Sequence, residues 1–288
     1  MKKIKLVKKP ITQWRVRVRS RHPSHNALRN AVIRLPFKSV IRLGSETVVK
    51  DVDVECNTVE AVKNSASKLL MKQCFTNAGV TTAPWFTYAG KNFFYEEGNK
   101  NDGTLAAHAL PFPLIVKSLH GSRGRGNSKI EDLKQLEDFL QNNNCNNYIF
   151  EQYKTYNREY RLHVTEQGCF YTCRKMLKRD TPEDKKFQRH DDNCVWILEE
   201  NPAFDKPVNW DAVVADCVKA LKSLGLDIGA FDLKIQSAKD GDGKIRKNPE
   251  WIVIESCSAP SFGEKTAEEY IKMVPQVLTN KFNSQKGN

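Results

Sequence analysis

A short apolar run that leads through a lysine into a glycine-rich loop is the stretch that most constrains this 288-residue chain. The run, Leu114–Val116, predicts a buried strand, and Lys117 follows it directly. Three glycines then fall within six residues, at Gly121, Gly124 and Gly126. Glycine lets the backbone turn sharply, and exposed backbone N–H groups beside a lysine can bind a phosphate. A flexible basic loop between two strands fits the same residues, so the stretch alone leaves both interpretations open.

The positive charge of the chain is concentrated near its N-terminus. Residues 1–50 contain 14 Lys and Arg and a single acid, within a chain whose net charge is +12. Such a field favours an acidic substrate or a polyanionic partner such as a nucleic acid. The segment Trp14–Arg19 alternates with period two, which would place Arg15, Arg17 and Arg19 on one face of a strand. An anion-binding face and a solvated edge strand both explain that pattern.

Periodicity predicts a mixture of helices and strands along the rest of the chain. Helices are expected over residues 58–78, 130–142, 210–224 and 266–282. Further strands are expected over residues 31–35, 39–43, 148–153, 159–165, 169–176, 228–236 and 251–256. Residues 178–194 show no regular period and are expected to form a long loop.

The sequence shows neither an apolar run long enough to cross a bilayer nor an apolar stretch after the basic N-terminus that would indicate a signal peptide. Its eight cysteines are scattered and none forms a CxxC pair, which disfavours a zinc site and a disulfide framework. Scattered free cysteines are typical of a reducing compartment. We therefore expect a cytoplasmic protein without a membrane segment.

Two carboxylates are predicted to meet at one end of a hairpin. Asp232 and Glu255 lie about equally far from the turn at residues 241–243, so they would face each other across paired strands. Carboxylate and phosphate oxygens together are the ligands that Mg²⁺ prefers. Two unrelated acids at a sheet edge fit the same spacing, but a phosphate-binding loop elsewhere in the chain favours the metal site.

In this order the motifs resemble the ATP-grasp superfamily, and within it the branch of ligases that add amino acids such as glutamate to a ribosomal protein or a peptide carboxylate. The resemblance covers about residues 57–282. It implies a mixed α/β (α+β) protein with the ATP-grasp fold, in which two α+β subdomains grip ATP. The implied divisions are a short, basic, β-rich N-terminal segment over 1–56, a subdomain with a glycine-rich lid over 57–155, and a C-terminal subdomain with metal-binding strands over 156–288.

The resemblance also implies which residues bind ATP. A lysine in the entry motif Asn64–Leu70 would contact a phosphate, the glycine loop would form a lid, the strand ending at Tyr153 would read adenine, and an acid would hold the ribose. The residues at these positions are Lys68, Lys117, Gly121, Ser122, Gly124, Gly126, Glu151, Gln152, Tyr153 and Glu159.

The same resemblance implies a catalytic set and a metal set. Arg161, Arg174 and Lys175 would face the γ-phosphate and the acyl substrate. Asp232, Glu255 and Cys257 would hold Mg²⁺, with Mn²⁺ as an alternative. Cys257 departs from the family pattern, which has an asparagine there, and a thiol is a poor ligand for a hard cation.

The activity implied is an ATP-dependent ligase that joins a carboxylate to an amine through an acyl phosphate. Its partners would be ATP and an acidic, amino-acid or peptide substrate, and homo-oligomers occur in the superfamily. Two alternatives remain open: an ATP-grasp protein that binds nucleic acid or another polyanion through residues 1–50 without ligase turnover, and an ATP-grasp phosphotransferase.

Overall fold

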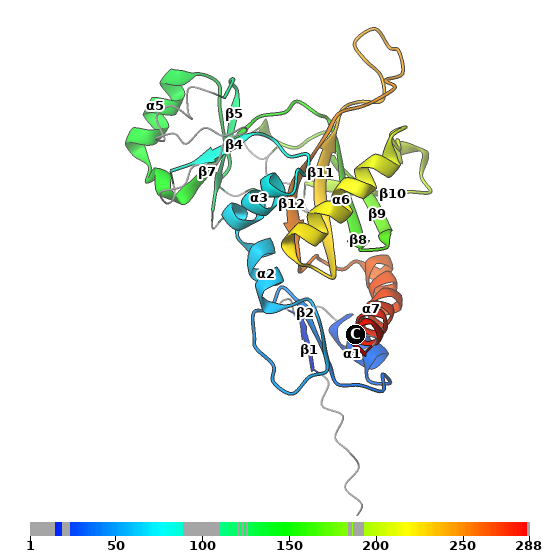
Figure 1. Ribbon diagram of the computed structural model, residues 1–288. Coiled ribbons are helices and arrows are strands. Elements are labelled where there is room, and N and C mark those ends of the chain that lie inside the picture. The colour runs from blue at the N-terminus through cyan, green and yellow to red at the C-terminus, as the bar shows by residue number, and fades with distance from the viewer. Residues whose placement is uncertain are drawn as a thin grey trace, which may run out of the picture.

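The computed structural model describes residues 15–18, 24–88, 110–119, 121, 124, 126–183, 186 and 193–286, with side chains from residue 26 onward. It contains three sheets with helices packed against them (Figure 1). The expected mixed α/β class is confirmed. None of the described helices is both long and apolar enough to cross a bilayer.

The N-terminal part forms a small parallel sheet rather than a simple β-rich segment. Its elements are β1 (Arg15–Val18), α1 (Ser24–Val32), β2 (Ser39–Leu43) and β3 (Val54–Cys56), with strand order β1-β2-β3. The expected strand over 39–43 is confirmed as β2, but the strand expected over 31–35 is wrong, because Ala31 and Val32 end α1. Leu28 and Val32, one helical turn apart, are buried against the C-terminal helix α7 (Glu264–Lys286), and this packing favours the helix. The side chains of the arginine ladder lie outside the described residues.

The predicted helix over 58–78 is two helices, α2 (Val59–Ala66) and α3 (Lys68–Asn77). Ser67 separates them with an extended backbone, and its hydroxyl accepts a hydrogen bond from the N–H of Leu70. Serine is a favoured residue at such a helix start. The break makes Lys68 the first residue of α3, and Gly79 follows the end of that helix with the positive φ of +65° expected of a stop.

The middle of the chain forms an antiparallel sheet of order β4-β7-β5-β6, covered on one face by α5. Its elements are β4 (Trp85–Thr87), β5 (Leu114–Ser118), β6 (Ser128–Ile130), α5 (Leu133–Asn142), the short helix η1 (Cys145–Asn147) and β7 (Tyr148–Gln152). Leu114, Val116 and Phe150 pack in the core beneath α5. Since side chains alternate along a strand, Lys117 and Glu151 lie on the opposite face. The helix expected from residue 130 starts only at Leu133, where Asp132 caps it.

The largest sheet has five antiparallel strands in the order β10-β9-β8-β11-β12, with α6 on one face. Its elements are β8 (Arg158–Thr165), β9 (Gly168–Leu177), β10 (Cys194–Leu198), η3 (Pro202–Phe204), α6 (Trp210–Leu224), β11 (Ile228–Ile235) and β12 (Trp251–Cys257). The sequence predicts the β8–β9 hairpin, the strands β11 and β12, and the helix α6, but it does not predict β10.

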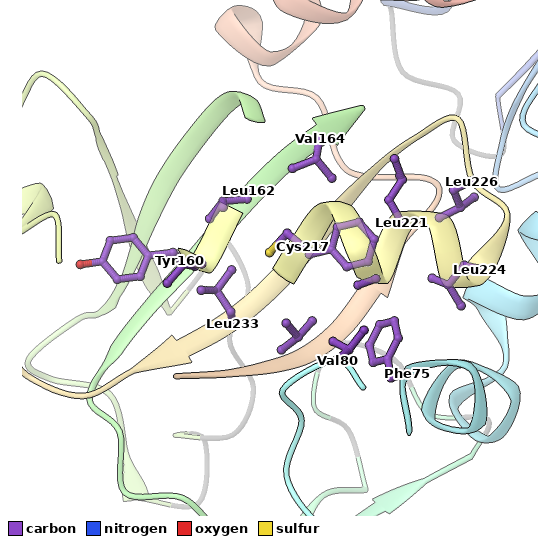
Figure 2. Close-up of a cluster of buried hydrophobic side chains, with 14 of the residues drawn as sticks. Phe75, Val80, Tyr160, Leu162, Val164, Cys217, Leu221, Leu224, Leu226 and Leu233 are labelled. Carbon is purple, nitrogen blue, oxygen red and sulfur yellow. The ribbon is translucent and has the colours of Figure 1, made fainter. Parts of the chain in front are cut away.

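A single core joins α6, α3 and the five-stranded sheet. Figure 2 shows side chains of β8, such as Leu162, and of β11, such as Leu233, pointing toward Cys217 and Leu221 of α6, with Phe75 of α3 beside them. The first helices after the N-terminal sheet are therefore packed on the same sheet that carries Asp232. The domain boundaries proposed at residues 56 and 155 stay predictions.

Candidate functional site

The two carboxylates predicted to form a pair do face each other. Asp232 on β11 is the register partner of Glu255 on β12, and a β-bulge follows directly after this pair. The hairpin prediction is thereby confirmed for the backbone positions. Asp232 is buried, with 6% of its surface exposed, while Glu255 is half-buried.

Four charged side chains around Asp232 form what we call the buried quartet: Glu159, Arg161, Lys175 and Asp232. Arg161 donates from Nε to Asp232 Oδ1 at 2.7 Å and from Nη2 to Oδ2 at 2.8 Å. Lys175 Nζ lies 3.3 Å from Asp232 Oδ2 and 3.1 Å from Glu159 Oε1. The contacts follow from register, since Arg161 pairs with Asp232 and Glu159 pairs with Lys175 across neighbouring strands.

Electrostatics keep Asp232 and Lys175 charged. Burial raises the pKa of Asp232, but Arg161 and Lys175 together hold it well below its usual range. Burial lowers the pKa of Lys175, and the two carboxylates Asp232 and Glu159 outweigh that effect and raise it. Two cations therefore face two carboxylates in a region with little access to water.

An aromatic side chain that the sequence did not single out covers this quartet. Trp196 of β10 is the register partner of Lys175. Its ring centroid lies 5.3 Å from Arg161 Cζ and 5.2 Å from Lys175 Nζ, both within the range of cation–π contacts. The run Cys194–Leu198, rich in β-branched and aromatic residues, was the available signal for a strand here.

A second charged group, the lysine cluster, consists of Lys68, Lys72, Lys117 and Glu151. Lys117 Nζ lies 2.8 Å from Glu151 Oε1, and Lys72 Nζ lies 3.0 Å from Glu151 Oε2. Lys72 and Glu151 are almost fully buried, with side chains 1% and 3% exposed. Lys72 was not predicted, although its position four residues after Lys68 places both on one face of α3.

The lysine cluster has more positive than negative charge. Burial raises the pKa of Glu151, but Lys117 and Lys72 together hold it below its usual range. Burial lowers the pKa of Lys72 to about 8, against the opposing effect of Glu151. Burial also lowers the pKa of Lys68, and Glu255 opposes that shift. Glu255 therefore lies within electrostatic range of the cluster while it pairs in register with Asp232, so it lies between the two groups.

The glycine-rich loop is tied to this cluster. Lys68 Nζ donates to the carbonyl oxygen of Gly121 at 2.5 Å. Gly124 and Gly126 have φ of +74° and +75°, in the left-handed region that other residues rarely adopt. Ser122, a predicted ATP contact, lies outside the described residues. The phosphate-binding role of the loop stays a prediction.

The predicted adenine-reading segment connects the two larger sheets. The backbone N–H groups of Gln152 and Tyr153 donate to Pro84 and Pro113 carbonyls, each at 2.9 Å. The Tyr153 ring lies 4.9 Å from Lys129 Nζ of β6 and 5.6 Å from Lys234 Nζ of β11. No contact here tests adenine binding by Glu151, Gln152 or Tyr153, or ribose binding by Glu159, so these roles stay predictions.

The structure does not bring Arg174 to the quartet beside Lys175, and its catalytic role stays a prediction. Its Nη1 donates to the carbonyl of Ala203 at 2.9 Å and lies 3.5 Å from Asp205 Oδ2. Neighbouring residues of a strand point to opposite faces of the sheet, so Arg174 and Lys175 cannot face one ligand together. Arg174 holds the η3 loop on the far face.

Asp232 and Glu255 fit Mg²⁺ by chemistry, whereas Cys257 does not. Glu255 makes no hydrogen bond or ion pair with any described residue, so its oxygens are open to a cation. Asp232 binds Arg161 and Lys175 and would have to exchange one of them for a metal. Burial raises the pKa of the Cys257 thiol, which keeps it protonated and a poor ligand. Within the described part of the chain, no three His, Cys, Asp or Glu side chains converge as a metal site, and the metal-binding roles of Asp232, Glu255 and Cys257 stay predictions.

The sequence of the chain matches no family model and no curated protein. Its fold matches solved structures. D-alanine–D-alanine ligase from Bacillus anthracis complexed with ATP aligns with a TM-score of 0.56 and 15% identity, over 91% of this chain and 84% of that one. The ATP-grasp ligase PsnB complexed with a minimal precursor aligns with a TM-score of 0.52 and 16% identity, over 79% and 63%.

A third match is N5-carboxyaminoimidazole synthetase from Staphylococcus aureus complexed with ADP, with a TM-score of 0.52 and 16% identity over 79% of this chain and 55% of that one. The chain spans less than two thirds of this enzyme and of PsnB. At such identities the matches show the fold, and they confirm the ATP-grasp fold expected from the motifs. The activity has to be argued from the residues of this chain.

Proposed function

We propose that this chain, which has the ATP-grasp fold, is an ATP-dependent ligase that joins a carboxylate to an amine through an acyl phosphate. One observation carries the proposal: Glu255 faces Asp232 of the charge-balanced buried quartet on one side and lies within electrostatic range of Lys68, in a lysine cluster with surplus positive charge, on the other. A nucleoside triphosphate carries several negative charges and binds as a complex with a divalent cation, so it needs both features.

In the proposed reaction the lysine cluster holds the phosphates of ATP. Lys68 and Lys117 come from different elements, α3 and β5, and would grip the phosphates from two sides while Gly121, Gly124 and Gly126 let the backbone approach. Asp232 and Glu255 would hold Mg²⁺, which supplies charge neutralisation between the phosphates when bound. The same role is open to Mn²⁺.

Arg161 and Lys175 are the proposed catalytic cations. A carboxylate oxygen of the substrate attacks the γ-phosphorus, the bond to ADP breaks, and an acyl phosphate forms. The amine then attacks the acyl carbon, phosphate leaves with the C–O bonding electrons, and the amine loses a proton. Positive charge fixed next to the developing negative charge lowers both barriers, and the Trp196 ring packs against both cations.

The substrate class we propose is an amino acid or a peptide carboxylate. The motifs resemble the glutamate-ligase branch, and a further matched structure of the ligase PsnB is complexed with a precursor peptide. We also propose that residues 1–50 contact a polyanion and that the chain assembles into a homo-oligomer.

The test is release of ADP and phosphate during incubation with ATP, Mg²⁺ and pairs drawn from a panel of amino acids and acidic peptides. We expect one carboxylate–amine pair to stimulate release and to yield an amide detectable by mass spectrometry. Glu255→Gln should abolish the stimulation, whereas Glu268→Gln, at an exposed position of α7, should leave it unchanged.

Two results would replace the ligase by another activity. A stable phosphorylated product without an amide would indicate a phosphotransferase. Salt-dependent binding of nucleic acid without any ATP turnover would indicate a polyanion-binding protein that keeps the fold, since phosphate contacts make affinity fall with salt.

A further inference from the structure

We infer that Lys72 is a positioning residue of the ATP site: without touching the nucleotide, it fixes the Glu151 carboxylate and thereby the direction of Lys117. The inference rests on the proposed function, because it assigns Lys117 to a phosphate. It extends that function to a residue that the motifs leave out.

Lys72 belongs to a continuous chain of polar contacts that crosses from one sheet to the other. Lys117 of β5 binds one oxygen of Glu151, and Lys72 of α3 binds the other, at 2.8 and 3.0 Å. Lys72 Nζ also donates to Thr82 Oγ1 at 2.5 Å. The Thr82 hydroxyl in turn donates to the carbonyl of Val253 at 2.9 Å. The chain therefore ends on β12, two residues before Glu255.

Burial separates the roles of the three lysines. The side chain of Lys72 is 1% exposed, and two of the three N–H groups of its ammonium group are donated to Glu151 and Thr82. The side chain of Lys117 is 11% exposed and has one ion-pair partner, Glu151, among the described residues. Lys68 is half-buried and reaches the glycine loop. Lys68 and Lys117 can reach a ligand, whereas Lys72 cannot.

A carboxylate held by a single lysine can rotate about its last bond, and its partner moves with it. Glu151 is held at both oxygens by cations from two different elements, so its plane is fixed. Fixing Glu151 fixes the position of the Lys117 ammonium group. The remaining contact, through Thr82, keeps β12 and therefore Glu255 at a constant distance from the same lysine. Such second contacts decide how well a ligand-binding group is oriented.

The test is a double-mutant cycle on nucleotide affinity, with binding of the fluorescent analogue TNP-ATP and Mg²⁺ as the probe. We expect Lys72→Gln to weaken binding about tenfold. Glu151→Gln should weaken it by a similar factor. If Lys72 acts through Glu151, the double variant should bind no more weakly than Glu151→Gln alone. Lys72→Arg, which keeps the charge and can bind a carboxylate, should recover most of the affinity.

The matched control is Lys63→Gln, an exposed lysine on the neighbouring helix α2, which should bind as the wild type does. Wild-type affinity in Lys72→Gln, or losses that multiply in the double variant, would overturn the positioning role and leave the proposed function standing. Absence of nucleotide binding by the wild type would overturn both. If Lys72→Gln does not fold, Thr82→Val cuts the same chain at its next contact, and wild-type affinity in that variant would count against the inference.

Discussion

The lysine cluster and the buried quartet use the same kinds of residue but balance their charges differently. In the quartet, Arg161 and Lys175 face two carboxylates, and the Asp232 carboxylate takes a bidentate contact from Arg161. In the lysine cluster, Lys72 and Lys117 share the carboxylate of Glu151, and Lys68 donates to the carbonyl oxygen of Gly121 instead. The charges of the quartet are therefore balanced among its own members, whereas the cluster has positive charge available for a ligand.

This difference separates stability from binding. A buried ion pair with good geometry contributes little net stability, but loss of one partner leaves an uncompensated buried charge. A cluster with excess positive charge destabilises the folded protein, and binding of an anion restores that stability. We expect changes in the quartet to be detected mainly in unfolding, and changes in the cluster mainly in nucleotide affinity.

The largest effect is expected from Asp232→Asn. The variant leaves Arg161 and Lys175 buried without their shared carboxylate, so the free energy of unfolding should fall by about 3 kcal/mol. Urea unfolding followed by circular dichroism measures it. Glu268→Gln, on the exposed surface, should change stability by less than about 0.5 kcal/mol. A similarly small change in Asp232→Asn would show that the quartet is not held as the contacts indicate.

Lys68→Met should show the opposite pattern. Among the described residues Lys68 has one hydrogen bond, to the carbonyl of Gly121, so its loss should alter stability little. A charge-assisted contact to phosphate contributes about 1.5–3 kcal/mol, so affinity for TNP-ATP should fall about thirtyfold. Isothermal titration measures the affinity for TNP-ATP, and urea unfolding of the same preparation measures the free energy of unfolding. A variant that loses stability but keeps affinity would reverse the division of roles.

How far these two groups could be predicted depends on how many strands their contacts involve. Asp232 and Glu255 could be predicted to face each other by counting residues from the turn of a single hairpin, and the structure confirms this pairing. The contact of Arg161 with Asp232 depends on the register between β8 and β11, which are joined by a long connection and cannot be counted from one turn. Alternation along a strand already forbade Arg174 and Lys175 from facing one ligand.

The missed residues share a physical reason. Lys72 is a lysine on an amphipathic helix, which sequence reasoning assigns to solvent, yet Glu151 from a strand distant in sequence makes its burial favourable. Residues 31–35 include β-branched residues typical of a strand, but packing of α1 against α7, more than two hundred residues later in the chain, selects the helix. Tertiary contacts decide both cases: the four-residue spacing of Lys68 and Lys72 indicates a shared helix face, but neither local pattern identifies the distant partner.

Arg161→Met tests whether the quartet closes the metal site. Removing the bidentate partner frees both Asp232 oxygens beside the open carboxylate of Glu255. Without nucleotide, the variant should bind Mn²⁺ about tenfold more tightly than the wild type, since carboxylate oxygens are suitable ligands for this cation. Electron paramagnetic resonance of free Mn²⁺ measures it without any turnover.

The matched control is Arg174→Met, an arginine of the same sheet that points to the far face. It should bind Mn²⁺ as the wild type does. Equal Mn²⁺ binding in Arg161→Met and the wild type would show that Arg161 does not compete with a metal for Asp232.

The smallest effect is expected from a change of pH. The lysine cluster and the buried quartet should contribute to the pH dependence of stability in different pH ranges. Lys72, which is acted on by Glu151, Lys117 and Glu255, has a pKa of about 8 in the folded chain, below the unfolded value of about 10.5. The unfolded state therefore binds more protons between these pH values, so the contribution of Lys72 to stability rises from pH 8 to 10.5.

The pKa of Asp232 is held below its unfolded value of about 3.9, so its contribution to stability is present above that pH and is lost on acidification.

Nucleotide affinity should fall as Lys72 loses its proton, whereas the contribution of Lys72 to stability rises over the same pH range. Once Lys72 is neutral, Lys117 is the one remaining cation paired with Glu151 in this cluster. Lys117 is then less available to a phosphate. Affinity for TNP-ATP at constant ionic strength should then fall about threefold from pH 7 to 9, a modest loss of charge-assisted binding. Lys72→Arg keeps its charge over this range and should remove the decline, and a decline of equal size in that variant would assign the effect to another group.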